Sequence, residues 1–322
     1  MTLLNTIPSL DLADFTTGDA TCKAKFVQDL GTAFNNIGFV AIKNHGLTND
    51  KTTDLYETVQ EFFLSSDELK QKYAIEGIAG QRGYIGKGKE TAKGFKAADL
   101  KEFYHVGQPI LNDGDPIWQE YPDNVFPNEF PNFENDTLHT YRTLESAGKQ
   151  LLRAIALYLE LPENYFEDKV KHGNSILRAI HYFPILNPEE LPEGAVRAAA
   201  HGDINLITLL MGASAEGLEV LRTDGKWIAI TSLPDYVVVN VGDMLDRLTN
   251  HKLKSTIHRV VNPPKEKLGT SRFSIPFFMH PRSEMDLTCL DSCVDVEHPK
   301  MYVNMTAGEF LNERLIELGL KK

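Results

Sequence analysis

Three residues in the second half of the chain have the types and spacing of a metal site. His201 and Asp203 are separated only by Gly202, and His258 lies further along the chain. Two imidazoles and one carboxylate hold a non-haem Fe(II) by one face and leave positions open for a substrate and O₂. Residues i and i+2 of a strand project to the same side, so one segment can present both His201 and Asp203 to an ion. We expect His258 to complete the site from a second strand.

Arg272 and Ser274 form a second pair with the same spacing. The guanidinium offers a planar fork to a carboxylate, and the serine hydroxyl adds another donor. Placed on one strand face, with Phe273 on the other, the pair suits one end of a dicarboxylate. Each short motif alone also fits a purely structural role, because ten histidines produce such a tripeptide by chance and arginine is common on strand surfaces.

Composition and charge restrict the class of protein. The chain has 322 residues, 42% hydrophobic and 24% charged, which is ordinary for a soluble globular protein with a sizeable core. Its net charge of −12 argues against non-specific binding to nucleic acid or anionic membranes. The N-terminal segment lacks the features of a secretory signal, and no apolar run approaches the roughly 20 residues of a membrane span. We therefore expect a small-molecule partner, no nucleic-acid or membrane partner, and a monomer by default.

The cysteines indicate a reducing compartment. Cys22, Cys289 and Cys293 are too few for a disulfide framework. Cys289 and Cys293 resemble half of a zinc site, but no second pair accompanies them, so ordinary thiols are the preferred interpretation. We predict a cytoplasmic location.

The hydrophobic pattern predicts helices and few strands in the first part of the chain. Helical spacing runs over 24–37, a short strand follows over 39–42, and another helix begins near Thr48. Residues 77–94 are rich in glycine but lack the spacing of a phosphate-binding loop, so we expect a mobile loop near the site. Residues 108–134 are expected to form an irregular connection, and a long helix with an apolar stripe follows over 138–159.

After that helix, short strand-like runs separated by turn residues predict a jelly roll. They cover 176–183, 206–211, 218–221, 227–230, 236–241, 257–261 and 272–278. A final helix begins with a capping box, Thr306 to Glu309. The predicted fold is mainly β with flanking helices, a double-stranded β-helix (jelly roll) core wrapped by N- and C-terminal helices. We expect one unit, 1–322, with an N-terminal α/β region (1–120), a jelly-roll core (172–284) and a C-terminal helical tail (285–322).

Longer motifs resemble the isopenicillin N synthase-like family of Fe(II)/2-oxoglutarate-dependent oxygenases over nearly the whole length. The similar segments are 36–40 with 44–47, 217–220 with 225–227, and 240–244 leading into 250–260, which contains His258. The resemblance implies that His201, Asp203 and His258 ligate Fe(II), and that Arg272 and Ser274 bind the distal carboxylate of 2-oxoglutarate. It also implies an O₂-dependent enzyme that hydroxylates, desaturates or cyclises a small molecule and releases succinate and CO₂, with no catalytic residue beyond the metal ligands.

The chain departs from the family pattern at two places. Gly202 stands where many relatives carry Thr or Ser, which removes a side chain without changing a ligand. Plant members often have Asn-Tyr-Tyr-Pro where this chain has His181-Tyr182-Phe183-Pro184. The second tyrosine of that motif can contact 2-oxoglutarate, so Phe183 lacks one hydroxyl contact. Side-chain alternation places Tyr182 on the opposite face from Phe183.

Three other functions remain open from the sequence. They are an Fe(II) oxidase of the same fold that does not use 2-oxoglutarate, a zinc hydrolase with the same ligand set, and a non-catalytic metal-binding jelly roll. The resemblance places several residues near the substrate, and the charged ones favour a polar or anionic molecule. These candidates are Arg82, Tyr84, Phe103, Tyr104, Arg178, His181 and His280.

Overall fold

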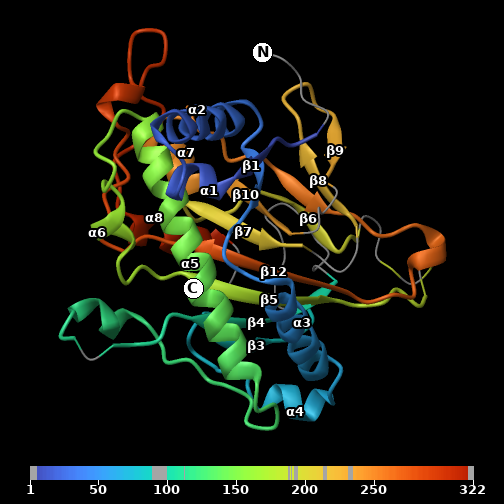
Figure 1. Ribbon diagram of the computed structural model, residues 1–322. Helices are drawn as coiled ribbons and strands as arrows, with labels where there is room; N and C mark the ends of the chain where they lie inside the picture. The colour runs from blue at the N-terminus through green and yellow to red at the C-terminus, as the bar shows by residue number, and fades with distance from the viewer. Residues whose placement is uncertain are drawn as a thin grey trace.

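Two β-sheets, flanked by helices, form the fold in the computed structural model (Figure 1). The structure describes residues 6–88, 100–111, 113–187, 189, 191, 195–212, 216–230 and 235–317. The large sheet has eight strands in the order β1-β2-β10-β7-β12-β5-β4-β3, and the small sheet has four in the order β6-β11-β8-β9. Only β1 and β2 pair in parallel among these strands.

The strands of the large sheet are β1 (Ser9–Asp11), β2 (Phe39–Lys43), β3 (Gly83–Ile85), β4 (Lys101–Gly107), β5 (Ile176–Tyr182), β7 (Ile207–Met211), β10 (Tyr236–Val241) and β12 (Arg272–Met279). Those of the small sheet are β6 (Ala198–His201), β8 (Leu218–Leu221), β9 (Trp227–Ala229) and β11 (His258–Val260). The α-helices are α1 (Leu12–Thr16), α2 (Ala20–Asn36), α3 (Asn49–Phe63), α4 (Asp67–Gln71), α5 (Phe133–Tyr158), α6 (Glu167–Val170), α7 (Asp243–Leu248) and α8 (Ala307–Glu317). Short 3₁₀ helices cover Pro116–Glu120, Lys265–Lys267 and Asp291–Cys293.

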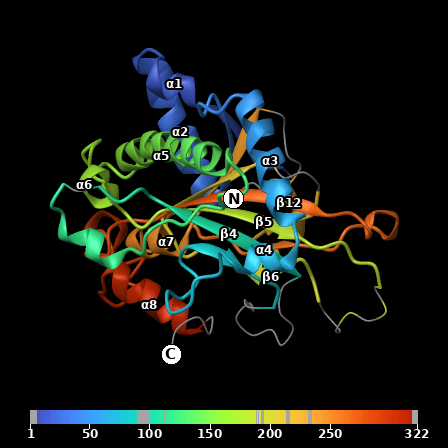
Figure 2. The same ribbon diagram turned by 90° about the horizontal axis from the view of Figure 1, so that it is seen from below.

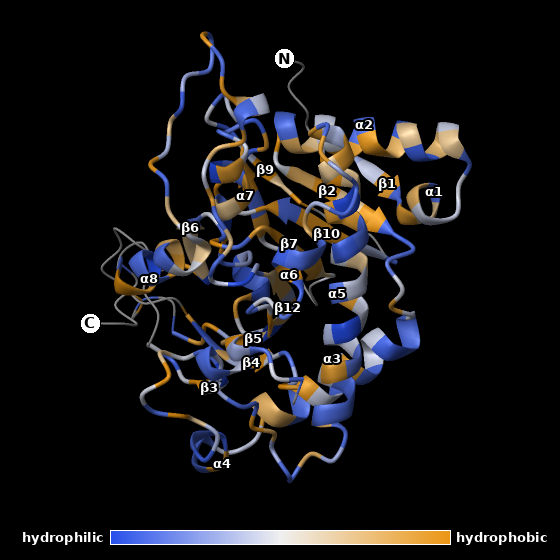
Figure 3. Cartoon of the chain, turned by 90° about the vertical axis from the view of Figure 1, so that its left-hand side faces the viewer, coloured by the Kyte–Doolittle hydropathy of each residue, from blue (hydrophilic) through white to orange (hydrophobic). Residues whose placement is uncertain are grey.

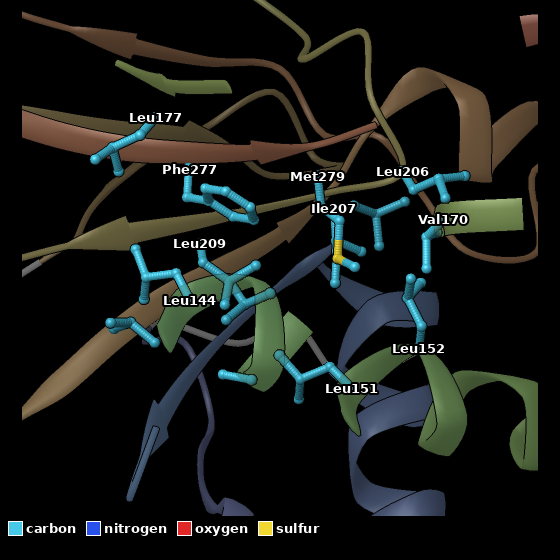
Figure 4. Packing of buried hydrophobic residues seen from close by; sticks show 14 of the residues in the cluster. Leu144, Leu151, Leu152, Val170, Leu177, Leu206, Ile207, Leu209, Phe277 and Met279 are labelled. Carbon is cyan, nitrogen blue, oxygen red and sulfur yellow. The ribbon is translucent and has the colours of Figure 1, made fainter. Parts of the chain in front are cut away.

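The outer face of the large sheet packs against helices. Figure 2 shows α2, α3 and α5 on one side of this sheet and α8 with β6 on the other. On α5, Leu144 lies toward Leu209 and Phe277 of the sheet, and Leu152 lies beside Val170 (Figure 4); all five are buried. Burial of such side chains stabilises the fold by about 1.5–3 kcal/mol each. This layer holds the sheet rigid behind the site.

The inner face of the large sheet is the face turned toward the small sheet. A buried cluster joins Phe103, Ile180 and Tyr182 of the large sheet to Ala198 and Val260 of the small one. Because side chains alternate along a strand, the intervening residues of β4 and β5 point to the helices instead. The inner face is therefore the surface on which a site can form.

The structure confirms the predicted fold class and most predicted elements. The final helix has its capping box, in which the Glu309 amide donates to Thr306 Oγ1 (3.2 Å) and the Thr306 amide donates to Glu309 Oε2 (2.7 Å). The glycine-rich stretch contains β3, and its residues 89–94 lie outside the described residues. Sequence patterns did not reveal α1, α7 and β6, which are short, or β4, which mixes charged and aromatic residues although it is buried throughout.

Hydropathy follows the layers of the fold. In Figure 3 the central strands β2 and β7 are largely hydrophobic, whereas α3 and α5 carry both hydrophilic and hydrophobic residues. This is the pattern of strands covered on both faces and helices covered on one. Among the described helices, none has the length and apolar character needed to cross a membrane.

Candidate metal centre and active-site cavity

His201, Asp203 and His258 come together on the inner side of the jelly roll. His201 ends β6, His258 begins β11, and the two residues are directly paired across the strands. Their ring centroids are 4.5 Å apart, and His258 Nε2 lies 3.7 Å from Asp203 Oδ1. One ligand atom from each of the three residues lies within 4.8 Å of the other two. Such a spacing fits three ligands bound to one metal ion.

Asp203 reaches this place by a different route from the one predicted. The i, i+2 spacing predicts one strand for His201 and Asp203, but β6 ends at His201 and Asp203 lies in the following turn. The turn is held by the amides of α7, because the Asp243 amide donates to the Asp203 carbonyl (2.7 Å). The start of α7 thus fixes the backbone that carries the carboxylate.

Each imidazole has one nitrogen engaged by the main chain. His201 Nδ1 lies 2.7 Å from the Ala199 carbonyl oxygen, and His258 Nδ1 lies 3.2 Å from that of Thr256. A carbonyl only accepts, so Nδ1 carries a proton in both rings, and in the neutral form of each ring the lone pair is therefore on Nε2. Both histidines are therefore prepared to ligate through Nε2.

The Asp203 carboxylate is oriented in a similar way. Its Oδ2 accepts hydrogen bonds from Thr208 Oγ1 (2.6 Å) and Asn240 Nδ2 (2.8 Å), both buried residues. This leaves Oδ1, the atom nearest His258, to face the metal position. Contacts of this kind fix a ligand's orientation and strengthen metal binding.

The protonation states also suit a cation. Burial, with a smaller effect of His258, lowers the pKa of His201 to about 4. Burial alone would raise the pKa of Asp203, but the two histidines and the hydrogen bonds from Asn240 and Thr208 outweigh it and hold that pKa below its ordinary value. At neutral pH the site presents neutral His201 and a carboxylate, which are ligands for a divalent transition metal.

Local packing explains why residue 202 is a glycine. A Cβ added there would lie 3.0 Å from both Asp243 Oδ1 and Ser255 Oγ. Ser255 Oγ donates to Asp243 Oδ1 (2.6 Å), and Asp243 lines the cavity described below. The space that a Thr or Ser side chain would need is therefore occupied by this pair.

Arg272 and Ser274 lie on the inner face of the large sheet. Their partners on β5 are Tyr182 and Ile180, and the Arg272 guanidinium lies over the Tyr182 ring, 4.9 Å from its centroid. Both Arg272 and Ser274 are buried. A buried cation with a neighbouring hydroxyl on one face provides the donors that a carboxylate requires.

Phe183 lies on the other face, away from Arg272. Its ring centroid is 5.0 Å from that of His181, which in turn stacks on Phe273 at 4.8 Å. The alternation predicted for Tyr182 and Phe183 is confirmed by these contacts. Phe183 therefore removes no hydroxyl from the neighbourhood of Arg272, where the tyrosine present is Tyr182.

A cavity of about 390 Å³ opens beside the three metal-ligand candidates. Its walls come from the loop before β3, from the inner faces of β4 and β5, from the end of β12 and from α8. Residues that line it include Gln81, Lys101, Phe103, His105, Asn174, Arg178, His201, Asp203, Asp243, Phe278, His280, Leu311 and Arg314. Its size and mixed lining suit a small organic molecule.

The structure places three of the seven predicted substrate residues in this cavity, namely Phe103, Arg178 and His280. Arg82 is buried behind the wall, where it donates to Asn174 Oδ1 (3.4 Å). Tyr84 and His181 contact Glu102 on the outer face, where Glu102 also pairs with Lys70. Tyr104 donates to the Val125 carbonyl (2.6 Å), also away from the cavity.

Lys101, His105, Gln81 and Asn174 line the cavity although no sequence motif indicated them. On β4, Lys101 and His105 share the inner face with Phe103, so period-two alternation would have found them once the strand was recognised. Gln81 and Asn174 lie outside strands and carried no such signal.

Arg178 is held at the cavity wall by its neighbours. Its Nε donates to His105 Nε2 (2.6 Å), and His105 Nδ1 lies 2.7 Å from the Gly80 carbonyl oxygen. The guanidinium also lies 4.3 Å from the Phe103 ring centroid and 5.1 Å from that of Phe278. Such contacts orient a cation and two aromatic rings in one wall.

Two family descriptions match this chain. Residues 7–129 match the non-haem dioxygenase in morphine synthesis N-terminal domain, and residues 173–281 match the 2OG-Fe(II) oxygenase superfamily. Among curated proteins, the proline hydroxylase buaE of Petromyces alliaceus is 32% identical, covering 97% of this chain and 99% of its own length. The 2-oxoglutarate-Fe(II) type oxidoreductase hxnY of Emericella nidulans is 30% identical, covering 94% and 88%.

Solved structures of similar proteins superpose on nearly the whole chain. A 2OG-Fe(II) oxygenase family protein from Caulobacter crescentus superposes with a TM-score of 0.85 at 43% identity, covering 98% of this chain and 99% of that one. A full-length Neurospora crassa protein in complex with alpha-KG and thymine superposes with a TM-score of 0.85 at 29% identity, covering 96% of each chain.

Proposed function

Because this chain belongs to the 2OG-Fe(II) oxygenase superfamily, we propose that His201, Asp203 and His258 hold its Fe(II). The protein is an Fe(II)- and 2-oxoglutarate-dependent oxygenase that oxidises a small molecule and releases succinate and CO₂. Bound iron supplies O₂ activation coupled to decarboxylation of the 2-oxo acid. The donor set supports this assignment, since two Nε2 atoms and Asp203 Oδ1 converge while their other polar atoms are engaged elsewhere.

We assign the distal carboxylate of 2-oxoglutarate to Arg272 and Ser274. Both side chains are buried on the inner face of β12, the strand whose Phe278 lines the cavity next to the metal-ligand candidates. The guanidinium supplies charge and a two-pronged donor, and Ser274 supplies one more hydrogen bond. Tyr182 stacks against Arg272 and limits the directions in which the guanidinium can turn.

The cavity favours a small, flat substrate that carries a carbonyl group. Phe103 and Phe278 provide aromatic surface, and Arg178 lies over both rings. The Neurospora crassa structure compared above contains thymine, a molecule of this kind. We propose that the substrate is a pyrimidine-like heterocycle, oxidised at a carbon placed next to the metal.

A chain of amides determines which hydrogen-bonding group faces such a substrate. Arg82 Nη2 donates to Asn174 Oδ1 (3.4 Å), and Asn174 Nδ2 donates to Gln81 Oε1 (3.2 Å). Arginine has no acceptor, so this order is fixed from the buried Arg82 outward. Gln81 is left with its Nε2 donor at the cavity wall, which complements a carbonyl oxygen. This single observation carries the substrate class.

The test is 2-oxoglutarate turnover across a substrate panel. The anaerobically Fe(II)-loaded protein is mixed with O₂, 2-oxoglutarate and thymine, uracil, L-proline or no substrate, and succinate and oxidised product are quantified. We expect a pyrimidine to give product in proportion to succinate. Turnover with L-proline alone would instead refute the pyrimidine assignment.

A matched variant tests the amide chain. Gln81→Glu keeps the shape of the side chain and replaces its donor by an acceptor, so KM for the pyrimidine should rise while KM for 2-oxoglutarate stays unchanged. The loss of one hydrogen bond in a buried site corresponds to roughly tenfold in KM. Unchanged KM for the pyrimidine would contradict the assigned order of the amides.

We propose an isopenicillin N synthase-like enzyme that acts in the cytoplasm as a monomer, without nucleic-acid or membrane partners. The net charge of −12 supports the absence of polyanionic partners. We also propose that 1–120, 172–284 and 285–322 form the N-terminal region, the core and the helical tail of one unit. Gel filtration with light scattering tests the oligomeric state.

A further inference from the structure

Arg197 is a buried arginine that the reaction described above does not use. It immediately precedes β6, and its side chain has no exposed surface. Nη2 donates to the Thr270 carbonyl (2.6 Å), whereas Nε and Nη1 are buried without a hydrogen-bond partner. Buried guanidinium N–H groups cost free energy unless an acceptor pairs with them. The geometry therefore calls for an acceptor at this position.

The surroundings of Arg197 in the described part of the chain offer it no carboxylate. None of the salt bridges found there involves Arg197. Burial, with a smaller effect of a second cation, Arg272, lowers the pKa of Arg197. Two buried guanidinium groups repel each other, and an anion bound between them offsets this repulsion.

The location of Arg197 matches the distal end of the 2-oxoglutarate site. Its Nη2 contacts Thr270, two residues before Arg272. The next residue, Ala198, belongs to the same buried cluster as Tyr182, over which Arg272 lies. The chain then runs along β6 from Arg197 to His201, about 13 Å at the rise of a strand. Arg197 and His201 thus lie at opposite ends of one short extended segment, which leaves room for a five-carbon dicarboxylate between their side chains.

We propose that Arg197 is a second guanidinium for the distal carboxylate of 2-oxoglutarate, acting beside Arg272 through its Nε and Nη1. This inference rests on the assignment of Arg272 and Ser274 to that carboxylate. Arg197 would make the site selective for a 2-oxo acid with a second carboxylate, since a monocarboxylate would place no negative charge beside these two cations.

The test compares two ligands that differ at the distal end. Binding of 2-oxoglutarate and of 2-oxobutyrate, which lacks the distal carboxylate, is measured by calorimetry with the Fe(II)-loaded protein in the absence of O₂. We expect Arg197→Gln to weaken 2-oxoglutarate binding roughly 10- to 100-fold, the effect of losing hydrogen bonds to a charged group. Binding of 2-oxobutyrate should stay unchanged, because this ligand does not reach Arg197.

Arg247→Gln is the matched control. Arg247 is also buried, also donates from Nη2 to one main-chain carbonyl, that of Val303 (2.7 Å), and also has an unpartnered Nε. Its guanidinium lies over the rings of Tyr302 and Phe310. We expect Arg247→Gln to lower the melting temperature without changing the affinity for either ligand.

Several results would overturn the proposal. Wild-type affinity of Arg197→Gln for 2-oxoglutarate would contradict it. An equal loss of affinity for 2-oxoglutarate and 2-oxobutyrate would indicate a purely structural role for Arg197. If Arg197→Gln does not fold, Arg197→Lys is used instead, because it keeps the charge but loses the planar guanidinium. Arg197→Lys should weaken the binding of 2-oxoglutarate and leave the binding of 2-oxobutyrate unchanged. An Arg272→Gln variant with wild-type affinity for 2-oxoglutarate would instead refute the underlying cosubstrate assignment.

Discussion

Thr208 orients the carboxylate that we assign to iron, so its replacement should weaken metal binding. Thr208 Oγ1 donates to Asp203 Oδ2 at 2.6 Å, and both residues are buried. Thr208→Val has nearly the same shape and removes only the hydroxyl. The second donor to Oδ2, Asn240 Nδ2 at 2.8 Å, remains in place. Thr208 Oγ1 also lies 3.2 Å from Asn205 Nδ2 and 3.2 Å from Asn205 Oδ1, so the variant removes the contacts with Asn205 together with the shorter one to Asp203.

The size of the effect follows from the type of hydrogen bond. A hydrogen bond to a charged group contributes about 1.5–3 kcal/mol, which corresponds to roughly 10- to 100-fold in affinity. Loss of a contact that supports a metal ligand falls in the same range. Because Asn240 still holds Oδ2, we expect a value near the lower end, about tenfold.

The assay is titration of the metal-free protein with Fe(II) in the absence of O₂, followed by calorimetry. Thr208→Ser is the control, since it keeps the hydroxyl and removes only a methyl group. We expect Thr208→Ser to bind Fe(II) nearly as the wild type does. Wild-type affinity in Thr208→Val would refute the reasoning, and equal losses in both variants would show that the methyl group matters instead.

Three further predictions concern other parts of the chain. Phe183→Tyr should leave KM for 2-oxoglutarate unchanged, because this ring lies with His181 away from Arg272; a lower KM would contradict that placement. Burial lowers the pKa of His280 from 6.5 to about 4, so the unfolded chain binds the proton first and stability falls as the pH drops from about 6.5 to 4. His280→Gln should remove up to ~3 kcal/mol of this loss in the free energy of unfolding. Denaturant unfolding of the metal-free protein across that pH range measures it, and a pH profile identical to that of the wild type would contradict the prediction. Gly31→Ala should destabilise the protein by about 1–3 kcal/mol, because its Cβ would lie 2.0 Å from the Tyr158 ring where α2 crosses α5. A higher melting temperature, as helix propensity alone favours, would show that the ring moves freely.

Residue types and spacing were sufficient to single out two groups of side chains that the fold brings together. His201, Asp203 and His258 form a convergent set, and Arg272 and Ser274 share an inner face. In both cases the chemistry depends on the side chains more than on the exact path of the backbone. The segment at Asp203 shows this, because the carboxylate still lies beside the two histidines although the strand ends at His201.

The lining of the cavity could not be predicted in the same way, because it depends on which face each strand turns inward. Arg178 and His181 are three residues apart on β5 and therefore cannot share a face, yet the family resemblance suggests both. The orientation of β4 decides that Phe103 lines the cavity and Tyr104 does not. Arg197 gave no sequence signal, since its significance lies in the missing partners of two buried nitrogens.

The wall formed by α8 has a consequence for the biosynthesis of the enzyme. Leu311 and Arg314 line the cavity from a helix that is translated after His201, Asp203 and His258. Until α8 has left the ribosome, the cavity beside these three metal-ligand candidates lacks the side that Leu311 and Arg314 form. The order of synthesis thus delays closure of the site until the rest of the jelly roll is available to fold.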